Sequence, residues 1–82
     1  MAERVTYGQL RYVLTELGFQ EKRRRQGVAL EHRASDTLFL FRPYEAEDPL
    51  QPAEVFYVTK QLDERGLLEP SSFKTLLTRA PA

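Results

Sequence analysis

Residues 19–44 constrain the fold more than any other part of the chain, because they hold three short segments of strand character separated by turn residues. Alternating side chains are expected over residues 19–26, 28–33 and 37–42. Gly27 interrupts the first segment, and Ala34-Ser35-Asp36 has the composition of a turn. Three strands joined by such short connections predict an antiparallel meander.

Apolar residues at helical spacing predict a helix on each side of this meander. The first helix begins after Thr6, which has capping-box spacing with Gln9, and ends before Gly18. The second begins at Pro52, which suits a first helical turn, and ends before Gly66. Their apolar stripes consist of Leu10, Val13, Leu14 and Leu17 in the first helix and Val55, Val58 and Leu62 in the second.

A short third helix is expected after Pro70 and Ser71, with Pro81 at its end and a stripe of Phe73, Leu76, Leu77 and Ala80. The acidic, proline-rich residues 43–52 form a connector that continues neither a strand nor a helix. The predicted fold class is therefore α+β with the order α-β-β-β-α plus a short C-terminal helix. Both main helices are expected to pack on one face of a three-stranded antiparallel sheet.

Composition narrows the classes of function. At 82 residues and 41% hydrophobic content, residues 1–82 are expected to form one domain with a thin core. With no cysteine and one histidine, we expect no disulfide framework, no metal site and no cofactor. A solvated loop explains Glu45, Glu47 and Asp48 better than a calcium site does. The sequence lacks a membrane-spanning run and the apolar core of a signal peptide, so a cytoplasmic protein is expected.

The order of several short motifs resembles a known family. The motifs are Leu17-Gly18-Phe19, a basic strand ending near Gly27, Leu30-Glu31-His32, Arg42-Pro43, Leu50-Gln51-Pro52 and Arg65-Gly66-Leu67. Together they resemble the HicA family of small bacterial toxin ribonucleases, whose fold is similar to the double-stranded-RNA-binding domain. The resemblance covers residues 6–77. It implies an RNA-binding domain related to toxin–antitoxin systems, with an antitoxin-like protein as a partner.

One departure from the family pattern concerns catalysis. HicA toxins carry a Gly-Ser-His motif at the start of the second strand, and its histidine is thought to assist RNA cleavage. This sequence has Ala29 at that position when aligned on Gly27, and Gly27 itself when aligned on Glu31-His32. Neither residue can exchange a proton near neutral pH as imidazole does. The resemblance therefore implies a catalytically inactive relative.

His32 is the remaining candidate for a catalytic residue. Period-two alternation places it on the same strand face as Val28 and Leu30, which are expected to face the core. A histidine at the end of the core face, hydrogen-bonded to the following turn, is the favoured interpretation, and catalysis is the alternative.

Basic residues concentrate in the first strand although the net charge is zero, with twelve basic and twelve acidic residues. If Phe19 points into the core, Lys22 and Arg24 lie on the open sheet face and Arg23 and Arg25 emerge at the edge. The functional interpretation is contact with nucleic-acid phosphates, and the other is an edge strand protected from pairing by its charges. The candidate RNA-binding residues are Lys22, Arg23, Arg24, Arg25, Arg33 and Arg42.

The third strand offers a candidate protein interface at Leu38, Phe39, Leu40 and Phe41. These residues put large apolar groups on both strand faces, although the helices can cover only one. Which pair points outward depends on the register set by the preceding turn, and residues 43–52 could instead fold back over the exposed pair. An uncovered pair would suit a protein partner or a homodimer. An interaction or oligomerisation module is thus the alternative to an RNA-binding domain.

Overall fold

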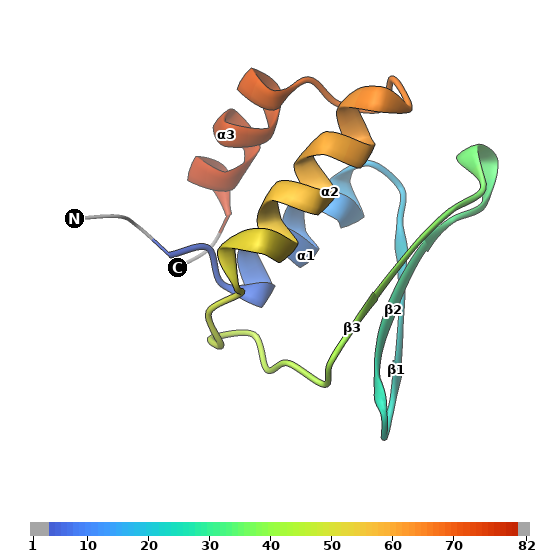
Figure 1. The fold of residues 1–82 in the computed structure, drawn as a ribbon, viewed down its shortest axis with the longest axis vertical. Helices are drawn as coiled ribbons and strands as arrows, with labels where there is room; N and C mark the ends of the chain where they lie inside the picture. Colours follow the sequence, from blue (N-terminus) through green and yellow to red (C-terminus); the bar gives the residue numbers. More distant parts are fainter. Residues whose placement is uncertain (1–3, 81–82) are drawn as a thin grey trace.

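The computed structural model describes residues 4–80 and consists of one small antiparallel sheet and three helices (Figure 1). A short 3-10 turn, Arg33–Ser35, connects the second and third strands. The α+β class and the order of the main elements are as predicted. In chain order these elements are α1 (Tyr7–Glu16), β1 (Gln20–Arg24), β2 (Gly27–His32), β3 (Thr37–Phe41), α2 (Pro52–Glu64) and α3 (Pro70–Arg79).

Local capping explains where α1 begins and ends. The Gln9 backbone amide donates to Thr6 Oγ1 at 3.2 Å, and the Thr6 amide donates to Gln9 Oε1 at 3.0 Å. This reciprocal pair is the predicted capping box. At the other end Gly18 has φ 99°, a left-handed conformation that glycine adopts without steric cost.

The other two helices also begin at residues suited to a first turn. Pro52 and Pro70 each occupy a position in the first helical turn, where the missing backbone N–H costs nothing. The third helix covers the predicted segment, and with ten residues α3 is as long as α1. The prediction that Pro81 ends it lies outside the described residues.

The three strands form an open sheet in the order β1-β2-β3, and both adjacent pairs are antiparallel. Because β2 is central, β1 and β3 are both edge strands. Figure 1 shows α1 and α2 on one side of the sheet and α3 on the far side of these two helices. One sheet face is thus covered by helices; the opposite face, which we call the open face, is not.

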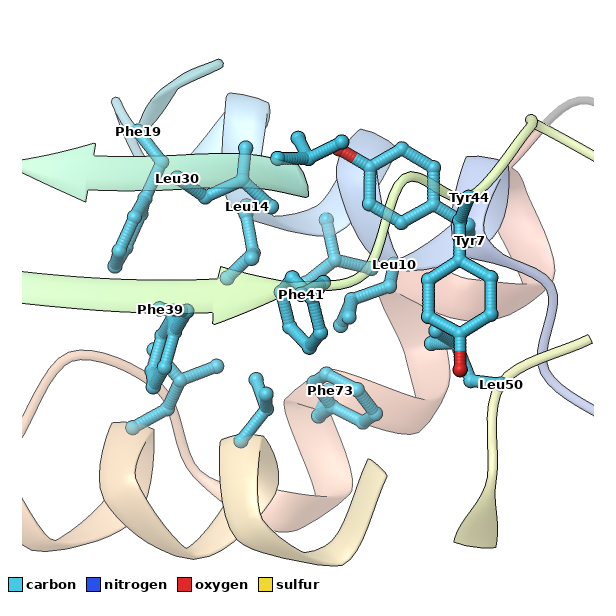
Figure 2. Close-up of a cluster of buried hydrophobic side chains, with 14 residues drawn as sticks. Tyr7, Leu10, Leu14, Phe19, Leu30, Phe39, Phe41, Tyr44, Leu50 and Phe73 are labelled. Carbon is cyan, nitrogen blue, oxygen red and sulfur yellow. The ribbon is translucent and has the colours of Figure 1, made fainter. Parts of the chain in front are cut away.

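The core lies between the sheet and the helices (Figure 2). Phe39 and Phe41 point into it, whereas Leu38 and Leu40 are 54% and 72% exposed. The structure thereby decides between the two registers that the sequence leaves open. The buried apolar residues are Tyr7, Leu10, Val13, Leu14, Phe19, Val28, Leu30, Phe39, Phe41, Tyr44, Leu50, Val58, Leu62 and Phe73.

The connector between β3 and α2 packs against the N-terminus of α1. The Tyr7 amide donates to the Asp48 carbonyl at 2.8 Å, and the Gly8 amide donates to the Ala46 carbonyl at 2.8 Å. These bonds satisfy two amides that a helix N-terminus leaves without a partner. The connector therefore does not fold back over β3, and the alternative in which it covers the exposed pair is wrong.

Candidate functional site on the open face

Cross-strand pairing arranges the open face as three rows of side chains. Residues directly opposite each other in an antiparallel pair share a face, and Val28 and Leu30 point into the core. Their neighbours Gly27, Ala29 and Glu31 therefore lie on the open face. From one end of the sheet to the other, the rows are Arg24, Gly27 and Arg42; Lys22, Ala29 and Leu40; and Gln20, Glu31 and Leu38.

Two of the predicted phosphate-binding cations share one carboxylate on this face. Lys22 Nζ lies 3.3 Å from Glu31 Oε1, and Arg33 Nε lies 3.9 Å from the same oxygen. Such partly exposed pairs contribute little to stability, yet they reduce the positive potential available to an anion. Lys22 and Arg33 are therefore weaker candidates than the sequence suggests.

Arg23 faces the helix side of β1, on the same strand face as Phe19. Its guanidinium Nη2 donates to the Tyr44 carbonyl at 2.6 Å and lies 3.7 Å from Glu21 Oε2. A third interaction joins Arg23 Nη1 to Glu45 at 3.9 Å. These contacts link β1 to the connector between β3 and α2. Arg23 therefore has a structural role and does not lie with Lys22 and Arg24 on the open face.

Arg24, Arg25 and Arg42 have no ion pair within residues 4–80. Arg24 lies opposite Gly27, Arg25 follows in the hairpin turn, and the Arg42 Cα lies close to Gly27 on its other side. All three are exposed. We call these three residues the arginine cluster. Beside it lies a shallow pocket of about 330 Å³, lined in part by Lys22, Arg24, Gln26, Gly27, Ala29 and Leu40.

A second group of charges joins β1 to α1 on the helix side. The Tyr7 hydroxyl donates to Glu21 Oε2 at 2.5 Å, and the same oxygen lies 3.6 Å from Arg11 Nη1. Burial, together with the hydrogen bond and the negative charge of Glu21, raises the pKa of Tyr7 well above its ordinary value. Sequence alternation places Glu21 on this face, but only the fold brings the Tyr7 hydroxyl to it.

His32 is held in place by its neighbours. Its Nδ1 lies 2.7 Å from Ser35 Oγ, and its ring stacks on Phe19 with centroids 5.0 Å apart. Ser35 Oγ in turn lies 2.6 Å from the hydroxyl of the buried Thr37. This geometry anchors the turn between β2 and β3.

Of the large apolar residues that are exposed within residues 4–80, Leu38, Leu40 and Tyr57 lie near β3, whereas Phe56 lines a pocket between α2 and the segment preceding α1. Leu38 and Leu40 lie on the open face of β3. Phe39 and Phe41 are buried, so these two residues are not available for the predicted protein interface. On the helix side, Tyr57 of α2 is 55% exposed and contacts the Phe39 ring edge-on, with centroids 6.1 Å apart. Sequence reasoning missed Tyr57, although its position beside the buried stripe of α2 was a usable signal.

A pocket of about 710 Å³ lies where the segment preceding α1 meets α2, and within residues 4–80 Arg4 is the only charged residue that lines it. Within residues 4–80, no group of three or more His, Cys, Asp or Glu side chains could hold a metal ion. No helix in the same part of the chain is long and apolar enough to cross a membrane.

The fold and the open face define a small α+β domain whose three-stranded antiparallel sheet has one face that the helices leave uncovered. Its two edges differ, one being charged and the other apolar. Comparison with known proteins adds no relative: no family model, no curated protein and no solved structure matches the chain.

Proposed function

We propose that this chain is a HicA-like, RNA-binding domain that lacks ribonuclease activity. The observation that carries the proposal is the arginine cluster, Arg24, Arg25 and Arg42, which is exposed and has no carboxylate partner within residues 4–80. The sequence resemblance to HicA toxins and the α-β-β-β-α element order point the same way.

The chemistry of arginine suits this role. A guanidinium group presents a planar fork of donors that matches phosphate geometry, and it stays charged at every physiological pH. Three such groups at one end of the sheet, around a glycine that adds no bulk, could follow a nucleic-acid backbone without reading its sequence. The net charge of the chain is zero, so this local cluster must supply the attraction.

Removing Arg24 or Arg25 by alanine substitution is expected to weaken RNA binding about equally for every RNA sequence. Each lost phosphate contact should lower the slope of log affinity against log salt concentration by about 0.7 to 0.9. Titration of fluorescent single-stranded and duplex RNA at several salt concentrations measures this slope. The matched control is Lys22→Ala, because the Lys22 charge is already partnered by Glu31 and its loss should change the slope less.

Equal effects of the control and of the arginine substitutions would contradict the role of the cluster. RNA binding that is undetectable even at low salt would remove the RNA-binding proposal altogether. In that case the charges of β1 would be explained by protection of its edge, and the variant lacking Lys22, Arg23, Arg24 and Arg25 should aggregate more readily.

We expect no ribonuclease turnover above background from the purified protein, and no growth arrest when it is produced alone in a bacterial cell. Neither Ala29 nor Gly27 carries a group that can take a proton from a ribose hydroxyl. His32→Ala tests the remaining candidate and should cost about 1 to 3 kcal/mol of stability, from the lost Ser35 hydrogen bond and Phe19 stacking. Cleavage that this substitution abolishes in a folded protein would make His32 catalytic.

A second candidate function, a protein-interaction module, is favoured by the difference between the two sheet edges. Strand β1 has the sequence QEKRR, and its charges discourage pairing with another strand. Strand β3 has the sequence TLFLF, with no charge and no proline. An edge strand of this composition, next to exposed Leu38 and Leu40, is suited to adding a further strand from a protein partner.

A further inference from the structure

The outer edge of β3 has backbone groups that no part of the described chain uses. Strand β3 pairs with β2 on one side only. Within residues 4–80, none of the backbone hydrogen bonds made by turns, loops and caps involves Thr37–Phe41. Half of the amides and carbonyls of an edge strand point away from the sheet, so they form a template for one more strand.

We propose that the occupant of this edge is β3 of a second copy of the chain, paired antiparallel about a twofold axis at Phe39. The two sheets then join into one continuous six-stranded sheet with both open faces on the same side. This inference rests on the interaction-module function and names its partner. A twofold interface of this kind uses the same patch on both copies, which must therefore be self-complementary.

The sequence around β3 is self-complementary in this register. Antiparallel pairing centred on Phe39 sets Leu38 opposite Leu40 of the second copy, so four leucines form one apolar cluster across the axis. The same register brings Asp36, which precedes β3, to the same end of the paired strands as Arg42, which follows β3 in the second copy, and the symmetry repeats this pair. Asp36 and Arg42 are both exposed, and neither has an ion pair within the described residues.

Other arrangements lose these pairings. In a continuous sheet, two residues that pair across the new edge must share a face. The smallest register shifts that keep this rule move the twofold axis from Phe39 to Leu38 or to Leu40. Either shift separates Asp36 from Arg42 and shortens the paired segment. Parallel pairing in register would set Asp36 against Asp36 and Arg42 against Arg42, which is unfavourable. The antiparallel register centred on Phe39 is therefore selected by charge as well as by apolar contact.

The helix side of the edge supports the same partner. Tyr57 is 55% exposed where its ring meets that of Phe39, the residue at the proposed axis. A second copy added there would bring the two Tyr57 side chains close to the axis. Apolar groups on both sides of the edge, Leu38 and Leu40 on one and Tyr57 on the other, would then leave water together.

Charge reversal at the two ends of β3 tests the register directly. Arg42→Glu sets Asp36 against glutamate in a homodimer, and Asp36→Lys sets lysine against Arg42, so each variant alone should dimerise at least about tenfold more weakly than the unmodified chain. Mixing the two variants creates two attractive pairs, and the heterodimer should regain an affinity close to that of the unmodified chain. Sedimentation velocity from about 1 μM to about 1 mM covers the range in which small interfaces dissociate.

The controls separate charge from folding. Lys74→Glu reverses an exposed charge on α3, away from the sheet, and should leave dimerisation unchanged. Asp36 has φ 54°, a left-handed conformation that lysine tolerates less well than aspartate. Asp36→Asn keeps this conformation accessible and should weaken the dimer by a smaller factor. Circular dichroism establishes that each variant is folded before its assembly is measured.

Each possible outcome decides a different question. The proposal is supported if Leu40→Glu abolishes the dimer, and if a mixture of Arg42→Glu and Asp36→Lys regains the affinity that each of these two variants alone has lost. A dimer that Leu40→Glu abolishes but the charge reversals leave intact keeps the β3 edge as an interface and overturns this register. A dimer that survives Leu40→Glu overturns both the register and the edge. A chain that stays monomeric at the highest concentration overturns self-pairing and leaves RNA binding untouched.

Discussion

Phe39→Glu is expected to unfold the domain, whereas Leu40→Glu should leave it folded. The two residues are neighbours in β3, yet Phe39 is 3% exposed and Leu40 is 72% exposed. Loss of a buried phenylalanine side chain alone costs about 3 to 5 kcal/mol, and an unpaired buried carboxylate adds to that cost. Small domains are stable by only about 5 to 15 kcal/mol, so the first substitution removes most or all of the margin.

Circular dichroism and urea titration of the two variants measure this difference. Leu38→Glu is the matched control, because Leu38 shares the open face with Leu40 and is 54% exposed. Both open-face variants should change the free energy of unfolding by less than about 1 kcal/mol. A folded Phe39→Glu protein, or an unfolded Leu40→Glu protein, would contradict the assignment of Phe39 to the core face of β3 and of Leu40 to the open face.

The second large effect is expected at alkaline pH, where the fold should lose stability as Tyr7 is forced to ionise. Burial is the main cause that raises the pKa of Tyr7, and the hydrogen bond to Glu21 acts in the same direction. Burial and the 2.6 Å hydrogen bond to Glu54 likewise raise the pKa of Tyr44. Both rings belong to the core and stack with centroids 6.0 Å apart.

The direction of the effect follows from proton linkage. An unfolded tyrosine ionises near pH 10, and both folded tyrosines ionise at a higher pH than that. Between these two values the folded state binds more protons than the unfolded state, so stability falls as pH rises. The stabilisation is fully present below pH 10 and is lost above it, by at most about 1.4 kcal/mol per pH unit for each tyrosine.

Urea titrations of the unmodified chain and of Tyr7→Phe from about pH 8 to about pH 11 test this prediction, since that range spans the tyrosine pKa. Tyr7→Phe should reduce the alkaline slope, although the variant is less stable at neutral pH because Glu21 loses its hydrogen-bond donor. Tyr57→Phe, at an exposed ring on α2, is the control and should leave the slope unchanged. An identical slope for all three proteins would contradict the assignment to Tyr7.

The helix ends were predictable from the sequence because the signals that set them are local. Thr6 and Gln9 cap α1 through bonds that span three residues, and Gly18 and Gly66 end helices through their own positive φ values. The three strands and their antiparallel order were predictable for a related reason. Short turns leave adjacent strands no arrangement other than pairing side by side.

The two faces of β3 could not be assigned from the sequence, because large apolar residues occur at consecutive positions. Alternation then fits either register equally well, and the choice depends on which pair fills the space left by α1 and α2. The structure places Phe39 and Phe41 there. The path of the connector was equally undetermined, since its hydrogen bonds go to the start of α1, about forty residues earlier in the chain.

The sequence by itself determined which residues could form the candidate site. These residues are a run of cations in β1 and the uncharged, mostly apolar residues of β3. Only the tertiary structure decided which cations remain available. Whether a charge is neutralised depends on carboxylates that the fold brings within a few ångströms, and local sequence does not encode that distance. Glu31 thereby weakens Lys22 and Arg33 as candidates, and Glu21 pairs with Arg23 on the helix side, whereas the arginine cluster has no carboxylate partner within residues 4–80.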